Sequence, residues 1–143
     1  MQIAHVLRTK GSLVSTMSRE ATVAEAIAEM AFQGIGALVI SADGDRIEGI
    51  VSERDIVRAI HIAGPSVIDE RVDSVMSSTV AICHLDDDIH SVMTTMTDLR
   101  VRHLPVVVDG HLVGIVSIGD VVKERIDELE REARELVDYI NAR

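Results

Sequence analysis

Residues 49–57 read GIVSERDIV, and residues 114–122 read GIVSIGDVV. Each stretch has an apolar run, then a serine, then an aspartate three residues later, and then more apolar residues. A short β-branched run that meets a Ser-x-x-Asp pattern is typical of a buried strand that leads directly into a helix. The chain therefore contains the same strand-to-helix junction twice, and each junction carries a hydroxyl and a carboxylate.

The duplication extends well beyond the two junctions. Asp55 and Asp120 lie 65 positions apart, and the Asp-Gly turn signals at 43–44 and 109–110 lie 66 apart. Such self-similarity indicates that neither copy buries its hydrophobic face alone. We expect two units at residues 1–63 and 70–126, joined by a linker at 64–69 and followed by an extension at 127–143.

Each copy predicts elements in the order β-α-β-β-α. The first helices follow the capping residues Thr22 and Asp88, and the second helices begin at Ser52 and Ser117. Pro105 falls inside a predicted strand and has no N–H, so we expect a sheet edge or an irregularity there. Strands are predicted at 12–16, 36–40 and 49–51 in the first copy and at 79–83, 103–108 and 114–116 in the second.

Composition restricts the partners that the chain can take. The 143 residues are 47% hydrophobic but only 1% aromatic, and the formal net charge is −10. The chain has few aromatic side chains on which bases could stack, and its charge repels a phosphate backbone, so we expect no nucleic-acid partner. A small anionic ligand would need basic side chains gathered locally.

Several other functions lack a signal in the sequence. No stretch has a signal-peptide pattern or the roughly 20 apolar residues that cross a bilayer, so we expect a soluble, cytoplasmic protein without a membrane partner. The single cysteine, Cys83, is predicted to be a buried structural residue. No metal-ligand spacing and no nucleophile–base constellation is present, so we predict no metal site, no catalytic residues and no enzymatic activity.

The last helix is predicted to continue into the extension, since neither Gly nor Pro occurs between Lys123 and Arg143. Five apolar residues there follow the 3, 4, 3, 4 spacing of a coiled coil, namely Ile126, Leu129, Ala133, Leu136 and Ile140. So short an amphipathic helix must dock on something. It can pack on its own units or against a second chain, and we favour the second chain.

The two junctions, the segment Val75-Met76-Ser77 and the run RHLPV at 102–106 together resemble a tandem pair of cystathionine-β-synthase (CBS) domains. Similar modules are inserted in IMP dehydrogenase. The resemblance covers about residues 1–126. It implies an α/β (α+β) fold in which two β-α-β-β-α units pack sheet to sheet with pseudo-two-fold symmetry, with a C-terminal helical extension here. It also implies a homodimer, and a cleft between the units that binds adenosine nucleotides.

The junction chemistry suits such a ligand. A carboxylate in the first turn of a helix can accept hydrogen bonds from both hydroxyls of a ribose, and the helix N-terminus favours an anion. The candidate ribose-binding residues are Ser52, Asp55, Ser117 and Asp120. The candidate phosphate-binding residues are Arg54, Arg102 and His103. The candidate adenine-adjacent residues are Lys10, Gly11, Leu38, Val51, Leu104, Pro105 and Val116.

The two copies differ in charge around their junctions. Gly119 stands where the first copy has Arg54, and Arg102-His103 stand where the first copy has Gly36-Ala37. We therefore expect the two clefts to differ in phosphate affinity. Ser-x-x-Asp also has a purely structural explanation, because the serine can cap its helix and the aspartate can favour the positive helix end without any ligand.

The sequence thus predicts a regulatory module that binds AMP, ADP, ATP or NAD(H) between its units, with no obligatory cofactor. The ligand-bound state would be passed to an unknown protein partner by a conformational shift. The alternative is a structural or protein-interaction module, used for dimerisation, with empty clefts.

Overall fold

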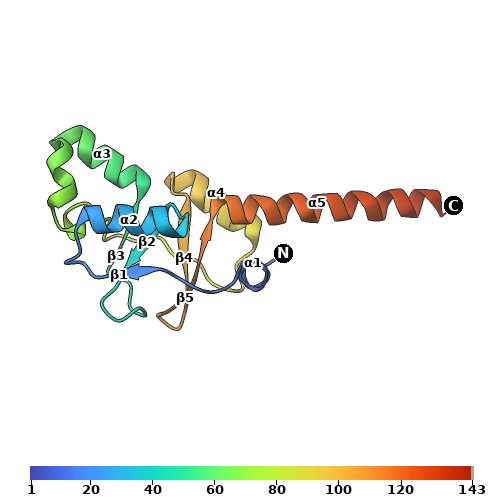
Figure 1. Cartoon of the computed structure of the whole chain (residues 1–143). Coiled ribbons are helices and arrows are strands. Elements are labelled where there is room, and N and C mark those ends of the chain that lie inside the picture. The colour runs from blue at the N-terminus through green and yellow to red at the C-terminus, as the bar shows by residue number, and fades with distance from the viewer. Residues whose placement is uncertain (143) are drawn as a thin grey trace.

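The computed structural model describes residues 1–142, and Figure 1 shows a mixed α/β body from which one long helix projects. The elements of the first half are α1 (Ile3–Lys10), β1 (Thr16–Met17), α2 (Val23–Gln33), β2 (Ala37–Ile40), β3 (Gly49–Ser52) and α3 (Glu53–Ala63). Two short 3₁₀ helices follow, η1 (Pro65–Asp69) and η2 (Val72–Ser74). The second half contains α4 (Ile89–Leu99), β4 (His103–Val108), β5 (His111–Ser117) and α5 (Ile118–Asn141).

The strands form two small sheets, one for each copy of the repeat. In the first sheet β2 lies between β1, which is parallel to it, and β3, which is antiparallel to it. In the second sheet β4 and β5 are antiparallel, with a bulge between Val106 and Val107. The predicted fold class, a mixed α/β arrangement with a C-terminal helix, is confirmed.

The predicted strands at 12–16 and 79–83 are largely wrong. Only Thr16–Met17 pairs in the first copy, and in the second only Cys83 forms a bridge, to Val106. Pro105 explains the short pairing. Its carbonyl accepts from the Cys83 N–H at 2.9 Å on the side away from β5, but it has no N–H to give in return. The ladder cannot extend, and the edge predicted at Pro105 is confirmed.

The predicted helix starts are confirmed by their caps. The Thr22 hydroxyl accepts from the Glu25 N–H at 3.1 Å, and the Asp88 carboxylate accepts from the His90 N–H at 2.9 Å. These bonds satisfy donors that a helix N-terminus leaves unpaired. The continuous last helix is also confirmed, because α5 runs unbroken for 24 residues. Arg143, the last residue of the predicted extension, lies outside the described residues.

The two hydrophobic cores do not follow the order of the chain. One core belongs to the second sheet, yet it includes Ile3, Val6 and Leu7 of α1, a helix that the sequence does not predict. The other core belongs to the first sheet and includes Val67 and Val72, from η1 and η2. The core of the second sheet is therefore completed by α1, at the start of the chain, and the core of the first sheet by η1 and η2, which follow α3. These segments do not follow the unit boundaries predicted from the repeat.

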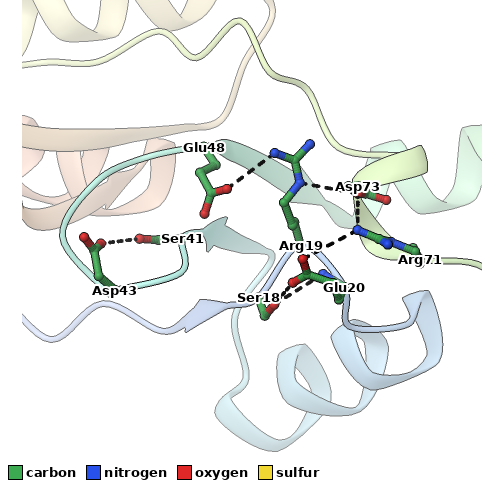
Figure 2. A network of polar contacts seen from close by, with 8 residues as sticks. All are labelled: Ser18, Arg19, Glu20, Ser41, Asp43, Glu48, Arg71 and Asp73. Atoms are coloured by element: carbon green, nitrogen blue, oxygen red, sulfur yellow. Dashed lines mark hydrogen bonds and ion pairs between the residues drawn. The ribbon is translucent and has the colours of Figure 1, made fainter.

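A polar network holds the segment after α3 against the first half (Figure 2). Arg19 contacts Glu48 at 3.5 Å and Asp73 at 3.4 Å, and Arg71 contacts the same Asp73 oxygen at 2.8 Å and Glu20 at 3.7 Å. Isolated surface pairs of this kind contribute little, about 0–1 kcal/mol each. Here four of them share partners, so the network fixes η2 beside the loop before α2.

The loop after β2 also contacts the start of β5. Nδ1 of His111 lies 2.7 Å from a carboxylate oxygen of Asp45, and the Leu112 N–H donates to the Asp45 carbonyl at 3.0 Å. The hydrogen bond and the negative charge of Asp45 raise the pKa of His111 above its ordinary value. The contact therefore joins the two halves by a pair whose strength depends on pH.

Because the His111 pKa is raised in the folded state, its stabilising effect is fully present in mild acid. That effect is lost as the pH rises through the raised pKa. In an NMR titration of the ring protons we expect the pKa of His111 to be lower in Asp45→Asn than in wild type, because the variant lacks the negative charge beside the ring. An unchanged His111 pKa in that variant would contradict the assigned contact.

Candidate ligand cleft

The first strand-to-helix junction forms a complete capping box. β3 ends at Ser52 in extended backbone and α3 begins at Glu53, so the Asp55 side chain folds back over the junction. The Asp55 carboxylate accepts from the Ser52 N–H at 2.9 Å and from the Ser52 hydroxyl at 3.0 Å. Only one carboxylate oxygen, Oδ2, is used in these bonds. The side chain is thus held in a fixed orientation and is only half-buried.

The second junction repeats this geometry. The Asp120 carboxylate accepts from the Ser117 N–H at 2.8 Å, and the Ser117 hydroxyl accepts from the Asp120 N–H at 3.1 Å. Both Ser-x-x-Asp motifs therefore cap helices, as the structural explanation of the motif requires. The caps do not prevent a second use of either carboxylate, because each keeps an oxygen outside the box.

A cleft of about 760 Å³ opens beside the first junction, and we call it the Asp55 cleft. Five predicted site residues line this cleft together, namely Ser52, Arg54, Asp55, Arg102 and His103. Its walls come from both halves of the chain. The first half contributes Gly36, Ala37, Ile50, Glu53 and Arg58, and the second contributes Ser77, Thr79, Val80, Ala81, Leu99, Arg100 and Val101.

Four arginines surround the Asp55 cleft, namely Arg54, Arg58, Arg100 and Arg102, against the two acids Glu53 and Asp55. This local excess of positive charge stands out in a chain of net charge −10. A smaller cavity of about 330 Å³ adjoins the cleft and shares the wall formed by Arg54, Arg100 and Arg102. Guanidinium groups bind phosphate oxygens in paired geometry, so this wall is chemically suited to a phosphorylated ligand.

Arg58 and Arg100 are not among the site residues predicted from the sequence. Arg58 lies four residues after Arg54, which places both on one face of α3, and this spacing was a usable signal. Arg100 follows α4 in the left-handed conformation, with φ of 55°, and its carbonyl accepts from Nη1 of Arg54 at 3.1 Å. That contact joins the halves across the cleft, and only the tertiary structure reveals it.

His103 lies where the two halves meet. A side chain on Gly36 would place its Cβ only 3.3 Å from Cε1 of His103, so the imidazole occupies space that a glycine leaves free. Burial, reinforced by the nearby Lys10 ammonium, lowers the pKa of His103 below its ordinary value. The ring is therefore neutral at neutral pH, and it can offer a ligand a hydrogen bond but not the positive charge that its prediction as a phosphate-binding residue suggests.

The second carboxylate is already engaged. Nζ of Lys10 lies 2.5 Å from Oδ2 of Asp120 and donates to the Ile115 carbonyl at 2.8 Å. Burial alone would raise the pKa of Asp120, but the hydrogen bonds from Lys10 and Ser117 outweigh it and hold that pKa below its usual range. Lys10, predicted to lie beside a base, does not line the Asp55 cleft, and its ammonium pairs with a predicted ribose-binding carboxylate of the other half.

The first junction has no equivalent of this pair. At the 66-residue offset of the repeat, Met76 stands where the second junction has Lys10. No basic side chain among residues 1–142 forms an ion pair with Asp55. The two junctions therefore also differ in the state of their carboxylates, because Lys10 pairs with Asp120 and no such cation pairs with Asp55.

The predicted adenine-adjacent wall requires a further correction. Leu38, Val51, Leu104 and Val116 are fully buried in the two cores and do not line the Asp55 cleft. Alternate residues of a strand point to opposite faces, so their neighbours Ala37 and Ile50 face the cleft instead. Pro105 is buried beside Cys83, and Gly11 ends α1 at an exposed position with φ of 99°. Neither Pro105 nor Gly11 lines the cleft.

Other candidate chemistry is accounted for structurally. Cys83 is buried as predicted, and burial together with the nearby Asp87 raises the pKa of its thiol to about 12, so it stays protonated. Within residues 1–142 no three His, Cys, Asp or Glu side chains are grouped in a way that could hold a metal ion. None of the helices in that part of the chain is long and apolar enough to cross a membrane.

Comparison with known proteins agrees with this architecture. The family model of the CBS domain matches residues 13–62 and 72–127. The mitochondrial CBS domain-containing protein CBSX3 of Arabidopsis thaliana is 32% identical over 146 residues, which cover 96% of this chain and 71% of the relative. A crystal structure of a CBS-domain-containing protein from Agrobacterium tumefaciens superposes with a TM-score of 0.84 at 36% identity, covering 87% of this chain and 99% of that one.

The chain belongs to the CBS-domain family and contains two CBS repeats. A further solved relative is a CBS domain protein from Pyrobaculum aerophilum in complex with AMP. It has a TM-score of 0.77 and 28% identity, and the match covers 91% of this chain and 97% of that one.

Proposed function

We propose that the protein is a regulatory module that binds an adenine nucleotide, AMP, ADP, ATP or NAD(H), in the Asp55 cleft. The observation that carries the proposal is the convergence of one oriented carboxylate and four arginines on a single cavity between the two halves. The AMP complex of the Pyrobaculum relative supports the ligand class.

The roles follow from the chemistry of each group. Asp55, oriented by Ser52, accepts hydrogen bonds from the two ribose hydroxyls, an arrangement that selects vicinal hydroxyls and is strengthened by the charge. The base lies against the apolar part of the wall, formed by Ala37, Ile50 and Val80. Arg54 and the other three arginines receive the phosphates, so we expect ATP and ADP to bind more tightly than adenosine.

We propose one occupied site in each chain. At the second junction a ribose would compete with the Lys10 ammonium for the Asp120 carboxylate, and no such cation competes for Asp55. The bound nucleotide contacts both halves, and it therefore favours the arrangement in which both contacts form. A homodimeric assembly and a protein partner that responds to this arrangement complete the proposal. A cytoplasmic location remains a prediction, since one relative is mitochondrial.

Thermal melting with and without millimolar nucleotide tests the proposal. A ligand that binds only the folded state raises the free energy of unfolding, by about 2.7 kcal/mol at a concentration 100 times the dissociation constant. The melting temperature must therefore rise. We expect shifts with AMP, ADP, ATP or NADH that exceed the shift with adenosine, and calorimetry should give one site per chain. No shift with any of these compounds would contradict the proposal and favour a purely structural module.

A further inference from the structure

The outer part of α5 has an apolar face that its own chain leaves exposed. The inner part packs against the body, where Glu124 contacts His5 at 3.4 Å and Glu128 contacts the N-terminal amine at 3.4 Å. Every residue from 129 to 142 is exposed, and the helix projects away from the body (Figure 1). At 1.5 Å per residue, the stretch beyond Glu128 extends about 20 Å.

The exposed apolar residues form one stripe. Ile126 is 50% exposed, Leu129 46%, Leu136 60% and Ile140 59%, and with Ala133 they occupy alternating a and d positions of a heptad repeat. An isolated helix of this length is marginal in water, and leaving these side chains exposed forfeits the free energy of their burial. The stripe therefore requires an apolar partner of the same length.

The charges beside the stripe indicate what that partner is. With Ile126 at an a position, Arg125 is a g residue and Glu130 is the next e residue. In a parallel pair of helices, a g residue lies beside the e residue five positions later on the other helix. Two copies of α5 side by side in parallel would therefore join Arg125 of each copy to Glu130 of the other, twice by symmetry. Arg125 already pairs with Glu128 at 2.8 Å, and its five donors allow both contacts.

Other occupants fit less well. An antiparallel pair that aligned Ile126 with Leu136 would place Glu130 of each helix at the level of Glu132 of the other, which is repulsive. A membrane surface is disfavoured because residues 127–142 contain six acidic and two basic side chains, whereas helices that lie on membranes have basic polar faces.

We propose that the outer halves of α5 from two copies of this chain form a parallel two-stranded coiled coil along the stripe from Ile126 to Ile140. The two bodies then lie at the same end of the pair. The site in each body does not depend on this contact, so the proposal holds whether or not a nucleotide binds.

The test uses the full chain and measures mass in solution by sedimentation. We expect wild type to be a dimer and Leu136→Glu to shift to monomer, with at least a tenfold weaker dimer. The matched control is Ile62→Glu, which changes a residue that is 77% exposed on α3 and should leave the dimer intact. Both positions are exposed, so both variants should keep the wild-type circular dichroism, which verifies that they fold.

The parallel orientation of the two helices is tested with Ile140→Cys under mild oxidation. In a parallel pair the two introduced thiols face each other and should form a disulfide-linked dimer, whereas in the antiparallel alignment they would lie about 27 Å apart, at 1.5 Å of rise per residue. Buried Cys83 provides the background in wild type. A monomeric wild type, a dimer that survives Leu136→Glu, or a dimer without cross-linking at residue 140 would each overturn the proposal.

Discussion

Replacing Asp55 by Ala is expected to weaken nucleotide binding on the order of 10- to 100-fold, because hydrogen bonds to a charged group contribute about 1.5–3 kcal/mol. The substitution removes the acceptor that Ser52 orients toward the cleft. It also removes half of a capping box, at a cost on the order of 1 kcal/mol in stability. Titration calorimetry with ATP, at a temperature where both proteins are folded, separates the two effects.

Asp120→Ala is the matched control. It breaks the same kind of capping box in the other half, but at a carboxylate that Lys10 already holds. We expect a similar loss of stability and a change in ATP affinity of less than about threefold, which corresponds to about 0.6 kcal/mol. Equal losses of affinity in the two variants would contradict a single occupied site, and unchanged affinity in Asp55→Ala would contradict the role of that carboxylate.

Replacing Ile3 by Ala is expected to lower the free energy of unfolding by about 2–5 kcal/mol, as for other fully buried large-to-small changes. Ile3 lies 108 residues or more from β5 in sequence, yet it is fully buried in the core beneath β4 and β5. Chemical denaturation at equilibrium measures the loss.

Leu13→Ala serves as the control for this measurement, because Leu13 is 96% exposed and its truncation should change stability by less than about 0.5 kcal/mol. If Ile3→Ala and Leu13→Ala lowered the free energy of unfolding by equally small amounts, α1 would not complete the second core. A large effect of Ile3→Ala alone supports the exchange of segments between the halves.

The features that the sequence predicts well are those set by local interactions. Ser52 and Ser117 begin helices because a side-chain cap and its partner lie three residues apart, which the sequence displays directly. The edge at Pro105 follows from a missing N–H. The unbroken α5 follows from the absence of Gly and Pro after Gly119. Each of these depends on neighbours within about one turn of the chain.

The features that it misses depend on contacts between distant segments. α1 is short and is stabilised by packing on the second core, so its own residues contain no strong helix signal. Leu38 and Val51 are predicted beside the base but lie in the core, because a strand pattern shows alternation but not which face meets a ligand. The pairing of Lys10 with Asp120 spans 110 residues, and no local pattern indicates it.

The concentration of arginines at one place in an acidic chain has a consequence for the size of anion that can bind. A phosphate group that approaches the chain meets a net charge of −10, whereas four guanidinium groups gather at the Asp55 cleft. A mononucleotide or dinucleotide can place all its phosphates within that region. We expect a polynucleotide to bind poorly, because most of its backbone would lie beyond these four arginines, over a chain of net negative charge.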